Sequence, residues 1–506
     1  MPQKFTRSSR SVLSVLGLVL FACALWFGWQ AYRVQPVSEG CLPLGDHHLV
    51  CAASDMARPA RRGAVPLEDA SFDLRGGAVR LEAARNETVA FQLIVRTVTA
   101  GAARLQLELA PFVAPAAAAA DAGATMRQID QQWFQAHYVA LENAGYTWGP
   151  PTEVLPWPAA YPDALIPATQ PCTPARPLSE SAVLAAEAGA NQAVWIDTYV
   201  GSDTPVGLHT QRIRLQIGAQ QLEVPVQLRV HAARLPDKPS FEAVGEIYGA
   251  YGLEGVGHDL TEPGWQAMAQ CYQQLAHRHR TVFIERFPKG LQASQQDAYV
   301  QTFGPALTGE LFTAAHGYRG PGAGQPLTVW RPPWPQRVDV TLDAPLAPAE
   351  LDHYQTLAAR WQSLVQRERW QHTRYFAYVF DEVDGPPAEG VDAGSHRRYV
   401  AMTHAEMARL QQTLDAGAPE VPLDLLWTSH SNPAQWQGDP ALDLTGKIRF
   451  WAPNASAADP AFLAERVQAG DTAWIYHSGH PSIGAHSINA SGIEMRTWGV
   501  ATARYG

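Results

Sequence analysis

The stretch TRYFAYVFDEVDGPP, residues 373–387, decides how the second half of this 506-residue chain is interpreted. The run Tyr375–Phe380 is apolar or aromatic throughout, which is typical of a strand buried in a parallel sheet. Asp381 and Glu382 follow directly, and Gly385 opens a turn that two prolines continue. Because α/β barrels place their chemistry at the carboxyl ends of strands, we expect a site at this pair. A solvated acidic turn, or a cap for the next helix, is the alternative interpretation.

Strands and helices alternate on both sides of this stretch. Further strands are predicted at 241–248, 281–284, 423–427, 448–451 and 472–476, and helices at 265–279, 348–366, 395–414 and 460–468. Repeated β–α units over residues 236–506 predict a (β/α)8-like barrel domain. We count at most seven strands before the sequence stops at Gly506. Either the barrel lacks its last strand or another segment supplies it.

The preceding residues, 63–235, follow a different pattern of short runs in which apolar and polar residues alternate. The clearest runs are Thr88–Val95, Arg104–Leu109, Arg212–Ile217 and Leu222–Val230. This period of two predicts half-buried antiparallel strands that form a β-sandwich domain. Two prolines in Leu235–Pro239 mark its boundary with the barrel. The predicted fold class is therefore multidomain, all-β followed by α/β.

The first 34 residues carry a membrane signal. Lys4, Arg7 and Arg10 precede the uncharged run 11–29, SVLSVLGLVLFACALWFGW, which is long enough to cross a bilayer as a helix. The cations stay on the cytoplasmic side, so we expect a single-pass anchor in the inner (cytoplasmic) membrane, with the bulk of the chain periplasmic or extracellular. A cleaved signal peptide is the alternative. Residues 35–62 are polar and contain proline, which predicts a linker.

The net charge of the chain bears on whether it binds nucleic acid. The chain has 38 Lys+Arg and 48 Asp+Glu, a net charge of -10, and contains no long basic block. Nucleic acid is excluded as a partner because its binding depends on clustered cations.

Five cysteines are too few for a disulfide scaffold, and none forms a C-x-x-C pair. Cys41 and Cys51 either form a bridge, if the compartment is oxidising, or remain reduced. Cys172 and Cys271 are isolated in the sequence and are predicted to be buried thiols.

Three histidines follow the last predicted strand, namely His477, His480 and His486. No acidic residue accompanies them at the spacing of metal ligands, so we predict no metal site. The sequence contains no nucleotide-binding or hydrolase-elbow motif, and no cofactor is expected.

The adjacency of Asp381 and Glu382 limits the chemistry they can perform. Ordinary glycosidases hold two carboxyl groups about 5 Å or more apart, usually on different strands, which neighbouring residues do not suit. Neighbours suit a substrate-assisted mechanism better. In that mechanism a 2-acetamido group on the sugar attacks its own anomeric carbon, one carboxylate orients the amide, and the other is the acid/base.

Four segments of the chain resemble glycoside hydrolase family 123, which includes bacterial β-N-acetylgalactosaminidases. They are residues 81–92 (LEAARNETVAFQ), Tyr378–Glu382, Trp474–Tyr476 and Ile493–Arg496. The resemblance implies a sandwich followed by a catalytic barrel. It also implies that Asp381 orients the acetamido group and that Glu382 is the general acid/base. Candidates to line the sugar pocket are then Trp427, Trp451, Trp474 and Tyr476, with Arg496 beneath it.

The sequence departs from the family pattern after the carboxylate pair, where Val383 and Asp384 stand in place of the proline that often follows. We predict a membrane-anchored glycoside hydrolase that acts on a carbohydrate or glycoconjugate with a terminal 2-acetamido sugar. The alternative is a non-catalytic carbohydrate-binding or structural protein of the cell envelope. The oligomeric state cannot be predicted from these patterns.

Overall fold

The computed structural model describes residues 40–65, 67, 69–115, 129–143, 154–168, 181–247, 263–285, 291, 293–335, 345–385, 389–477 and 483–505. The predicted membrane segment, 11–29, lies outside these residues. Within the described ranges, no helix combines the length and the apolar character that crossing a membrane requires.

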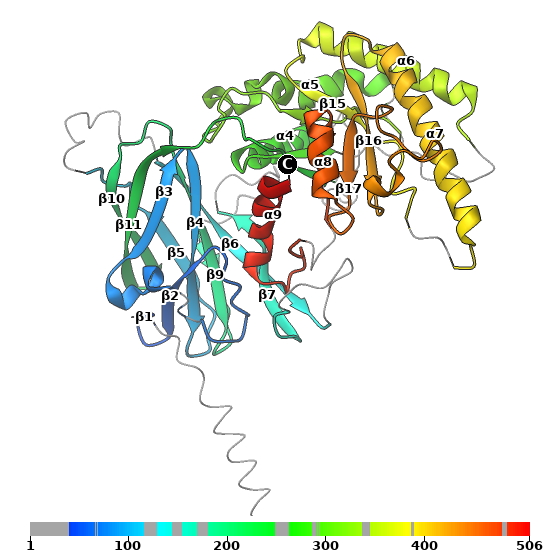
Figure 1. Ribbon diagram of the computed structural model, residues 1–506. Helices are drawn as coiled ribbons and strands as arrows, with labels where there is room; N and C mark the ends of the chain where they lie inside the picture. Colours follow the sequence, from blue (N-terminus) through cyan, green and yellow to red (C-terminus); the bar gives the residue numbers. More distant parts are fainter. Residues whose placement is uncertain are drawn as a thin grey trace, which may run out of the picture.

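The N-terminal part is a stack of two sheets (Figure 1). The first has the order β1 (Leu42–Leu44), β2 (His48–Ser54), β4 (Glu87–Thr97), β9 (Asn191–Val200), β6 (Ile129–Leu141) and β7 (Ala159–Pro167). The second has the order β3 (Val79–Arg85), β11 (Gln220–Arg234), β10 (Gly207–Ile217), β5 (Arg104–Leu109) and β8 (Ser181–Val183). One buried cluster joins residues of both sheets, such as Leu93 of β4 and Leu228 of β11.

Alternation explains why these segments form strands. In β11, Val224, Val226, Leu228 and Val230 are buried, while the residues between them are exposed or half-buried. Pairing is antiparallel except between β3 and β11, which run parallel. The predicted β-sandwich is thus present as two packed sheets.

The predicted linker over 35–62 is wrong in its described part. Residues 42–54 form β1 and β2, and β2 pairs along its whole length with β4. The pairing brings Cys41 and Cys51 together, and they form a disulfide. Cys271 is disulfide-bonded as well, so the prediction of a free buried thiol at this position is also wrong.

The C-terminal part alternates strands and helices. Its described strands are parallel: β12 (Ala243–Ile247), β13 (Thr281–Glu285), β14 (Val329–Trp330), β15 (Arg374–Ala377), β16 (Leu423–Ser429), β17 (Phe450–Pro453) and β18 (Thr472–Ala473). Its helices are α4 (Pro263–Arg278), α5 (Gln296–Thr308), α6 (Pro348–Glu368), α7 (Ala393–Gly417), α8 (Pro460–Gln468) and α9 (Gly492–Tyr505). Caps fix the helix starts, since the carboxylates of Asp392 and Asp459 accept backbone N–H bonds at the starts of α7 and α8.

The described strands do not form one closed ring. β12 and β13 make a two-stranded sheet, and β14 to β18 make a separate five-stranded sheet. Among the described residues no strand follows β18, and the chain forms α9 instead. The α/β class is therefore present, whereas the closed (β/α)8 barrel is not shown.

The two parts meet at a polar junction. Asn86, buried and with a φ of 62°, donates from Nδ2 to Leu235 O (2.9 Å) and to Asp237 Oδ1 (3.0 Å). Arg280 donates to Asn86 O (2.7 Å) and to Pro236 O (2.6 Å). These bonds fix the end of the sandwich against the start of the α/β part.

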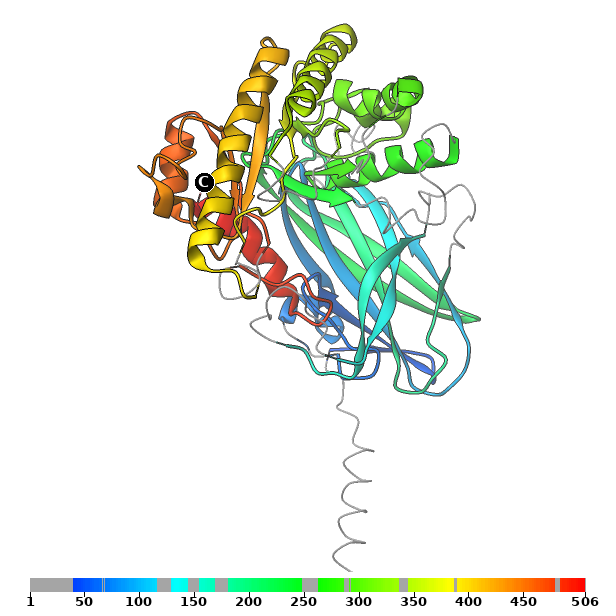
Figure 2. The same cartoon turned by 90° about the vertical axis from the view of Figure 1, so that its right-hand side faces the viewer.

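A second connection runs through the C-terminal helix. Figures 1 and 2 show α9, in red, between the sandwich and the α/β part. Ala490, just before α9, forms a β-bridge with Val154, and Arg496 pairs with Asp55 near the end of β2. The C-terminal segment therefore packs against the sandwich rather than adding a strand to the parallel sheet.

Candidate active site

Asp381 and Glu382 lie beyond the carboxyl end of β15, as predicted. Asp381 is exposed, and Glu382 is half-buried with a φ of 46°. A left-handed backbone is rare for a residue with a side chain, and it breaks the strand alternation that would separate two neighbours. Such conformations cluster at functional sites, where surrounding contacts hold them.

Two hydroxyl groups connect the Asp381 carboxylate to the backbone of Glu382. Tyr378 donates its hydroxyl proton to Asp381 Oδ1 (2.5 Å), and Thr428 Oγ1 lies 3.4 Å from the Tyr378 hydroxyl. The backbone N–H of Glu382 donates to the same Thr428 oxygen (3.1 Å). The two acids therefore share one polar network, which a simple acidic turn would not require.

The Glu382 carboxyl has a partner on each oxygen. Tyr476 donates its hydroxyl to Oε1, and Nε2 of His430 lies 2.6 Å from Oε2. Burial, and then the neighbouring Glu382, raise the pKa of Tyr476 well above its usual value. Tyr476 consequently remains a neutral hydroxyl and acts as a donor to Glu382.

The loop that carries the acids is bonded to the loop after β16. Ser429 donates to Oδ2 of the buried Asp384, and Ser431 donates to the Asp384 carbonyl oxygen (3.1 Å). Burial raises the pKa of Asp384, and the hydrogen bond from Ser429 opposes that rise. Asp384 is one of the two residues that stand in place of the family's proline. Its bonds to Ser429 and Ser431 hold the loop that carries the acids against the loop after β16.

Trp427 and Trp451 do not line the site, which corrects the prediction for both. They are 0% and 2% exposed, and their rings contact each other at a centroid distance of 5.4 Å. Trp427 packs toward His404 of α7 and Trp451 toward Phe462 of α8. Because side chains alternate along a strand, Thr428 at the site places its neighbour Trp427 on the helix-covered face.

Trp474 and Tyr476 lie on the opposite face of the sheet from that pair. Trp474 packs edge-to-face on Phe450 (centroids 4.5 Å) and Phe376 (5.6 Å). It is half-buried and contributes to the core below the site. Tyr476, two residues further on, reaches Glu382, so it is a predicted aromatic residue that directly contacts one of the two candidate acids.

Arg496 does not lie beneath the carboxylates. It sits on α9, and its guanidinium pairs with Asp55 of the sandwich. We therefore remove Arg496 from the site.

Sequence reasoning missed three contributors, Tyr378, Thr428 and His430. Two signals were available. Tyr378 directly follows β15 and precedes the acids in the same run, and Thr428–His430 follow the next predicted strand. Side chains at the carboxyl ends of neighbouring parallel strands converge, so His430 could have been proposed from its position.

The described residues contain no group of three His, Cys, Asp or Glu side chains placed to hold a metal ion. His477 and His486 contact each other and Trp498 through their rings, and burial lowers the pKa of both. His480 lies outside the described residues.

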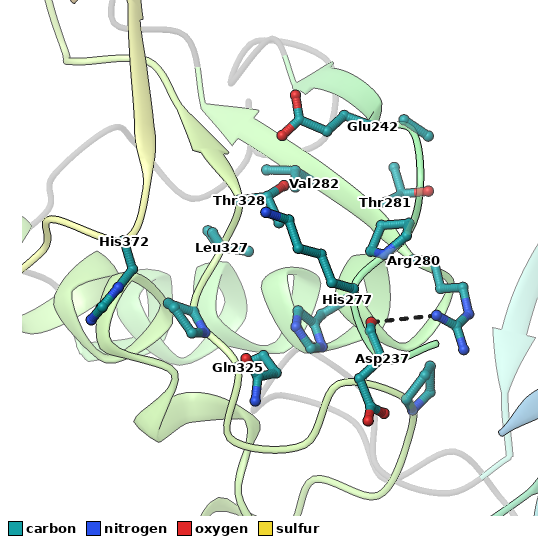
Figure 3. A pocket seen from close by; sticks show the side chains of 15 residues that line it. Asp237, Glu242, His277, Arg280, Thr281, Val282, Gln325, Leu327, Thr328 and His372 are labelled. Carbon is teal, nitrogen blue, oxygen red and sulfur yellow. Dashed lines mark hydrogen bonds between the residues drawn. The ribbon is translucent and has the colours of Figure 1, made fainter. Parts of the chain in front are cut away.

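A cavity of about 340 Å³ occupies the other end of the strands (Figure 3). It is lined by Glu242, Thr281, Thr328 and His372, which stand at or just before the starts of β12, β13, β14 and β15. Asp381 and Glu382 do not line it. The cavity and the pair of acids therefore lie at opposite ends of the parallel strands.

Comparison with known proteins finds a similar fold but no similar sequence. No family model matches the chain, and no curated protein matches it in sequence. Two solved structures are too distant to carry an argument. One is β-glucuronidase 3 of Bacteroides uniformis, with a TM-score of 0.24 and 10% identity over 79% of this chain and 38% of that one. The other is the CooA pilin subunit of enterotoxigenic Escherichia coli, with a TM-score of 0.18 and 10% identity over 37% of this chain and 99% of that one. A family 123 glycoside hydrolase from Clostridium perfringens, solved in a study of glycolipid glycan hydrolysis, superposes with a TM-score of 0.51 at 9% identity, over 88% of this chain and 74% of that one. This chain shares the fold of that enzyme, and at such an identity the likeness extends to the fold alone.

Proposed function

We propose that the protein is a glycoside hydrolase that removes a terminal 2-acetamido sugar by a substrate-assisted, retaining mechanism. The observation that carries the proposal is the network that joins the adjacent acids through Tyr378 and Thr428. Both acids stand at the carboxyl ends of parallel strands, where this class of fold places its reactive groups. The fold likeness to a family 123 glycoside hydrolase supports the same assignment.

In the first step, the carbonyl oxygen of the acetamido group attacks the anomeric carbon while the bond to the leaving oxygen breaks. Asp381 accepts the amide N–H and holds the attacking oxygen in line, an intramolecular arrangement that avoids a second nucleophile. Glu382 gives its proton to the leaving oxygen, which departs as an alcohol. The sugar remains as a bicyclic oxazolinium ion whose charge Asp381 offsets.

In the second step, water attacks the anomeric carbon and the acetamido group is restored. Glu382, now a carboxylate, takes the proton from that water, so its starting state returns. Two inversions retain the configuration. Attack by a 2-acetamido group requires a trans leaving group, so β-linked gluco or galacto sugars are the expected substrates.

The place of action is part of the proposal. The run 11–29 after three cations supports an anchor in the inner membrane with the bulk of the chain outside the cytoplasm. The Cys41–Cys51 disulfide and the bonded Cys271 support an oxidising compartment. A glycan or glycoconjugate of the cell envelope is then the proposed substrate.

The test is a panel of para-nitrophenyl glycosides given to the full-length protein in detergent. We expect turnover of a β-linked 2-acetamido sugar and little turnover of the matching sugar with a 2-hydroxyl group. A variant with Asp381→Asn should bind but not turn over the substrate. If the wild-type protein binds these sugars without cleaving any of them, the non-catalytic carbohydrate-binding alternative replaces the enzyme.

A further inference from the structure

The contact between His430 and Glu382 assigns His430 a task that the two-carboxylate scheme does not contain. Nε2 of His430 and Oε2 of Glu382 are 2.6 Å apart, a distance at which one proton must lie between them. Tyr476 already donates to the other oxygen and keeps its own proton. The proton that links Nε2 and Oε2 therefore belongs to the histidine–glutamate pair.

His430 is held in place by the loop on which it lies. It directly follows Ser429, whose hydroxyl is bonded to Asp384 and to Ser431 O. Gly385 lies against the pair, because a Cβ at this position would come within 3.5 Å of His430 Cδ2 and 3.3 Å of Glu382 O. The His430 side chain is 31% exposed, so it can exchange protons with solvent while the contact stays formed.

The other titratable groups around His430 do not compete for this proton. Tyr476 faces it with ring centroids 6.4 Å apart and remains a hydroxyl. Asp384 is buried and reaches this loop through Ser429, and Asp381 is bonded to Tyr378. Glu382 is thus the acid with which His430 shares its proton.

We infer that His430 is a positioning residue that keeps Glu382 loaded with the proton that it donates to the leaving oxygen. The inference rests on the proposed function. Before the reaction the pair holds one proton, on Oε2 or on Nε2. In the first step this proton passes from Oε2 to the leaving oxygen and the pair is left without one. In the second step the attacking water gives a proton to Glu382, which refills the pair.

The pairing has a measurable consequence because coupled sites lose protons as a pair. Glutamic acid alone is ionised above about pH 4.3. In the pair the proton lies between Nε2 and Oε2, so its loss depends on the imidazole as well as on the carboxyl. The alkaline limb of kcat/KM should then depend on His430.

The first experiment compares His430→Gln with the matched change His372→Gln, at an exposed histidine of the opposite strand ends. Glutamine can still donate to Oε2 but cannot hold the shared proton. We expect His430→Gln to keep KM, to retain kcat/KM within a few-fold at acid pH, and to move the alkaline limb at least about one pH unit lower. His372→Gln should leave the profile unchanged. A wild-type profile in His430→Gln, or an equal loss at every pH, would overturn this role of His430.

The second experiment needs no activity. The imidazole titration of His430, followed by NMR, should change in Glu382→Gln, because the carboxyl with which Nε2 shares its proton is gone. Glu242→Gln, at the other end of the sheet, should leave that titration in place. An unchanged His430 titration in Glu382→Gln overturns the pairing and leaves the glycosidase proposal standing. A wild-type protein that cleaves no glycoside overturns the proposed function, and the catalytic role of His430 with it, even where the titration shift is found.

Discussion

Charged side chains gather at both ends of the parallel strands, and they are bonded in different ways. At the start of the strands, the Asp237 carboxylate accepts bonds from Asn86 Nδ2, Gly322 N and Arg234. Arg280 donates to the backbone carbonyls of Pro236, Asn86 and Asp237, and Figure 3 shows its bond to Asp237. At their ends, the Glu382 carboxyl accepts a bond from the Tyr476 hydroxyl and contacts the His430 imidazole, a group that can gain and lose a proton.

The comparison shows that the charged groups at the start of the strands hold the structure together, whereas those at the ends are placed for chemistry. The bonds at the start of the strands join the sandwich to the α/β part, and they occupy the Asp237 carboxylate with structural contacts. The bonds at the ends orient carboxyl groups that stay partly open to solvent, since the side chain of Glu382 is 29% exposed. We therefore expect changes at the two ends to affect different measurements.

The largest effect is expected from the acids themselves. Asp381→Asn should lower kcat/KM by about 1,000-fold for good and poor leaving groups alike, because the amide is no longer oriented and its charge no longer offset. Glu382→Gln should lose as much with a poor leaving group and much less with a good one, which needs little proton donation. Steady-state kinetics with a series of aryl glycosides measures both.

Glu389→Gln is the control for these two variants, because Glu389 is exposed on the same loop and lies outside the network. It should keep wild-type kinetics. Equal losses for Glu382→Gln across all leaving groups would reject its role as the acid.

A smaller effect is expected from Tyr476→Phe. It removes the donor to Glu382 Oε1 and should lower kcat/KM about tenfold, with KM little changed. Tyr375→Phe makes the same change at a buried hydroxyl that donates to Trp370 O (2.7 Å). We expect that variant to lose stability but not activity, and a drop in kcat/KM equal to that of Tyr476→Phe would show that the effect is not local to Glu382.

At the start of the strands, Arg280→Met should reduce stability and spare the chemistry. The change leaves the carbonyls of Pro236 and Asn86 without their donor and should lower the free energy of unfolding by about 2 kcal/mol. Arg369→Met is the matched control, since Arg369 is exposed and has a similar φ, 62° against 57°. Denaturant unfolding measures both variants, and a kcat/KM loss without a stability loss in Arg280→Met would contradict the division between the two ends.

The smallest effect is expected from Glu242→Gln, in the cavity of Figure 3. Its Oε2 is buried, has no hydrogen bond to the part of the chain that the structure describes, and lies 3.9 Å from Arg374 Nη1. Neutralising it should change the free energy of unfolding by no more than about 0.5 kcal/mol and leave kcat/KM unchanged. A loss of activity comparable to that of Asp381→Asn would place the functional site at this end instead.

The sequence allowed most strands and helices to be predicted because their patterns are local. Alternation marked the sandwich strands β4, β5, β10 and β11, and the apolar run Tyr375–Phe380 marked the strand before the acids. The strands β1, β2 and β6 to β9 were missed; β1 is three residues long and contains a proline, and β2 gains its place by pairing with β4. Closure of the barrel could not be judged, since it depends on hydrogen bonds between segments far apart in the chain.

The site was predictable only in part, for the same reason. Asp381 and Glu382 are adjacent in sequence and follow a strand, so their position could be inferred. The direction of a tryptophan on a strand depends on which face the helices cover, so Trp427 and Trp451 were placed on the wrong side. His430 and Thr428 reach Glu382 only through the neighbouring strand, across 48 and 46 positions of sequence.

Participation of the substrate's own acetamido group is the central claim, and fluorination of that group tests it most directly. The measurement is kcat/KM for one aryl β-glycoside carrying acetyl, monofluoroacetyl, difluoroacetyl and trifluoroacetyl groups on the 2-amino nitrogen. Each fluorine withdraws electrons from the attacking carbonyl oxygen, so the account predicts a steep, steady fall in kcat/KM along the series. A kcat/KM that does not change with fluorination would show that this oxygen is not the nucleophile, and would contradict the roles given to Asp381 and Glu382.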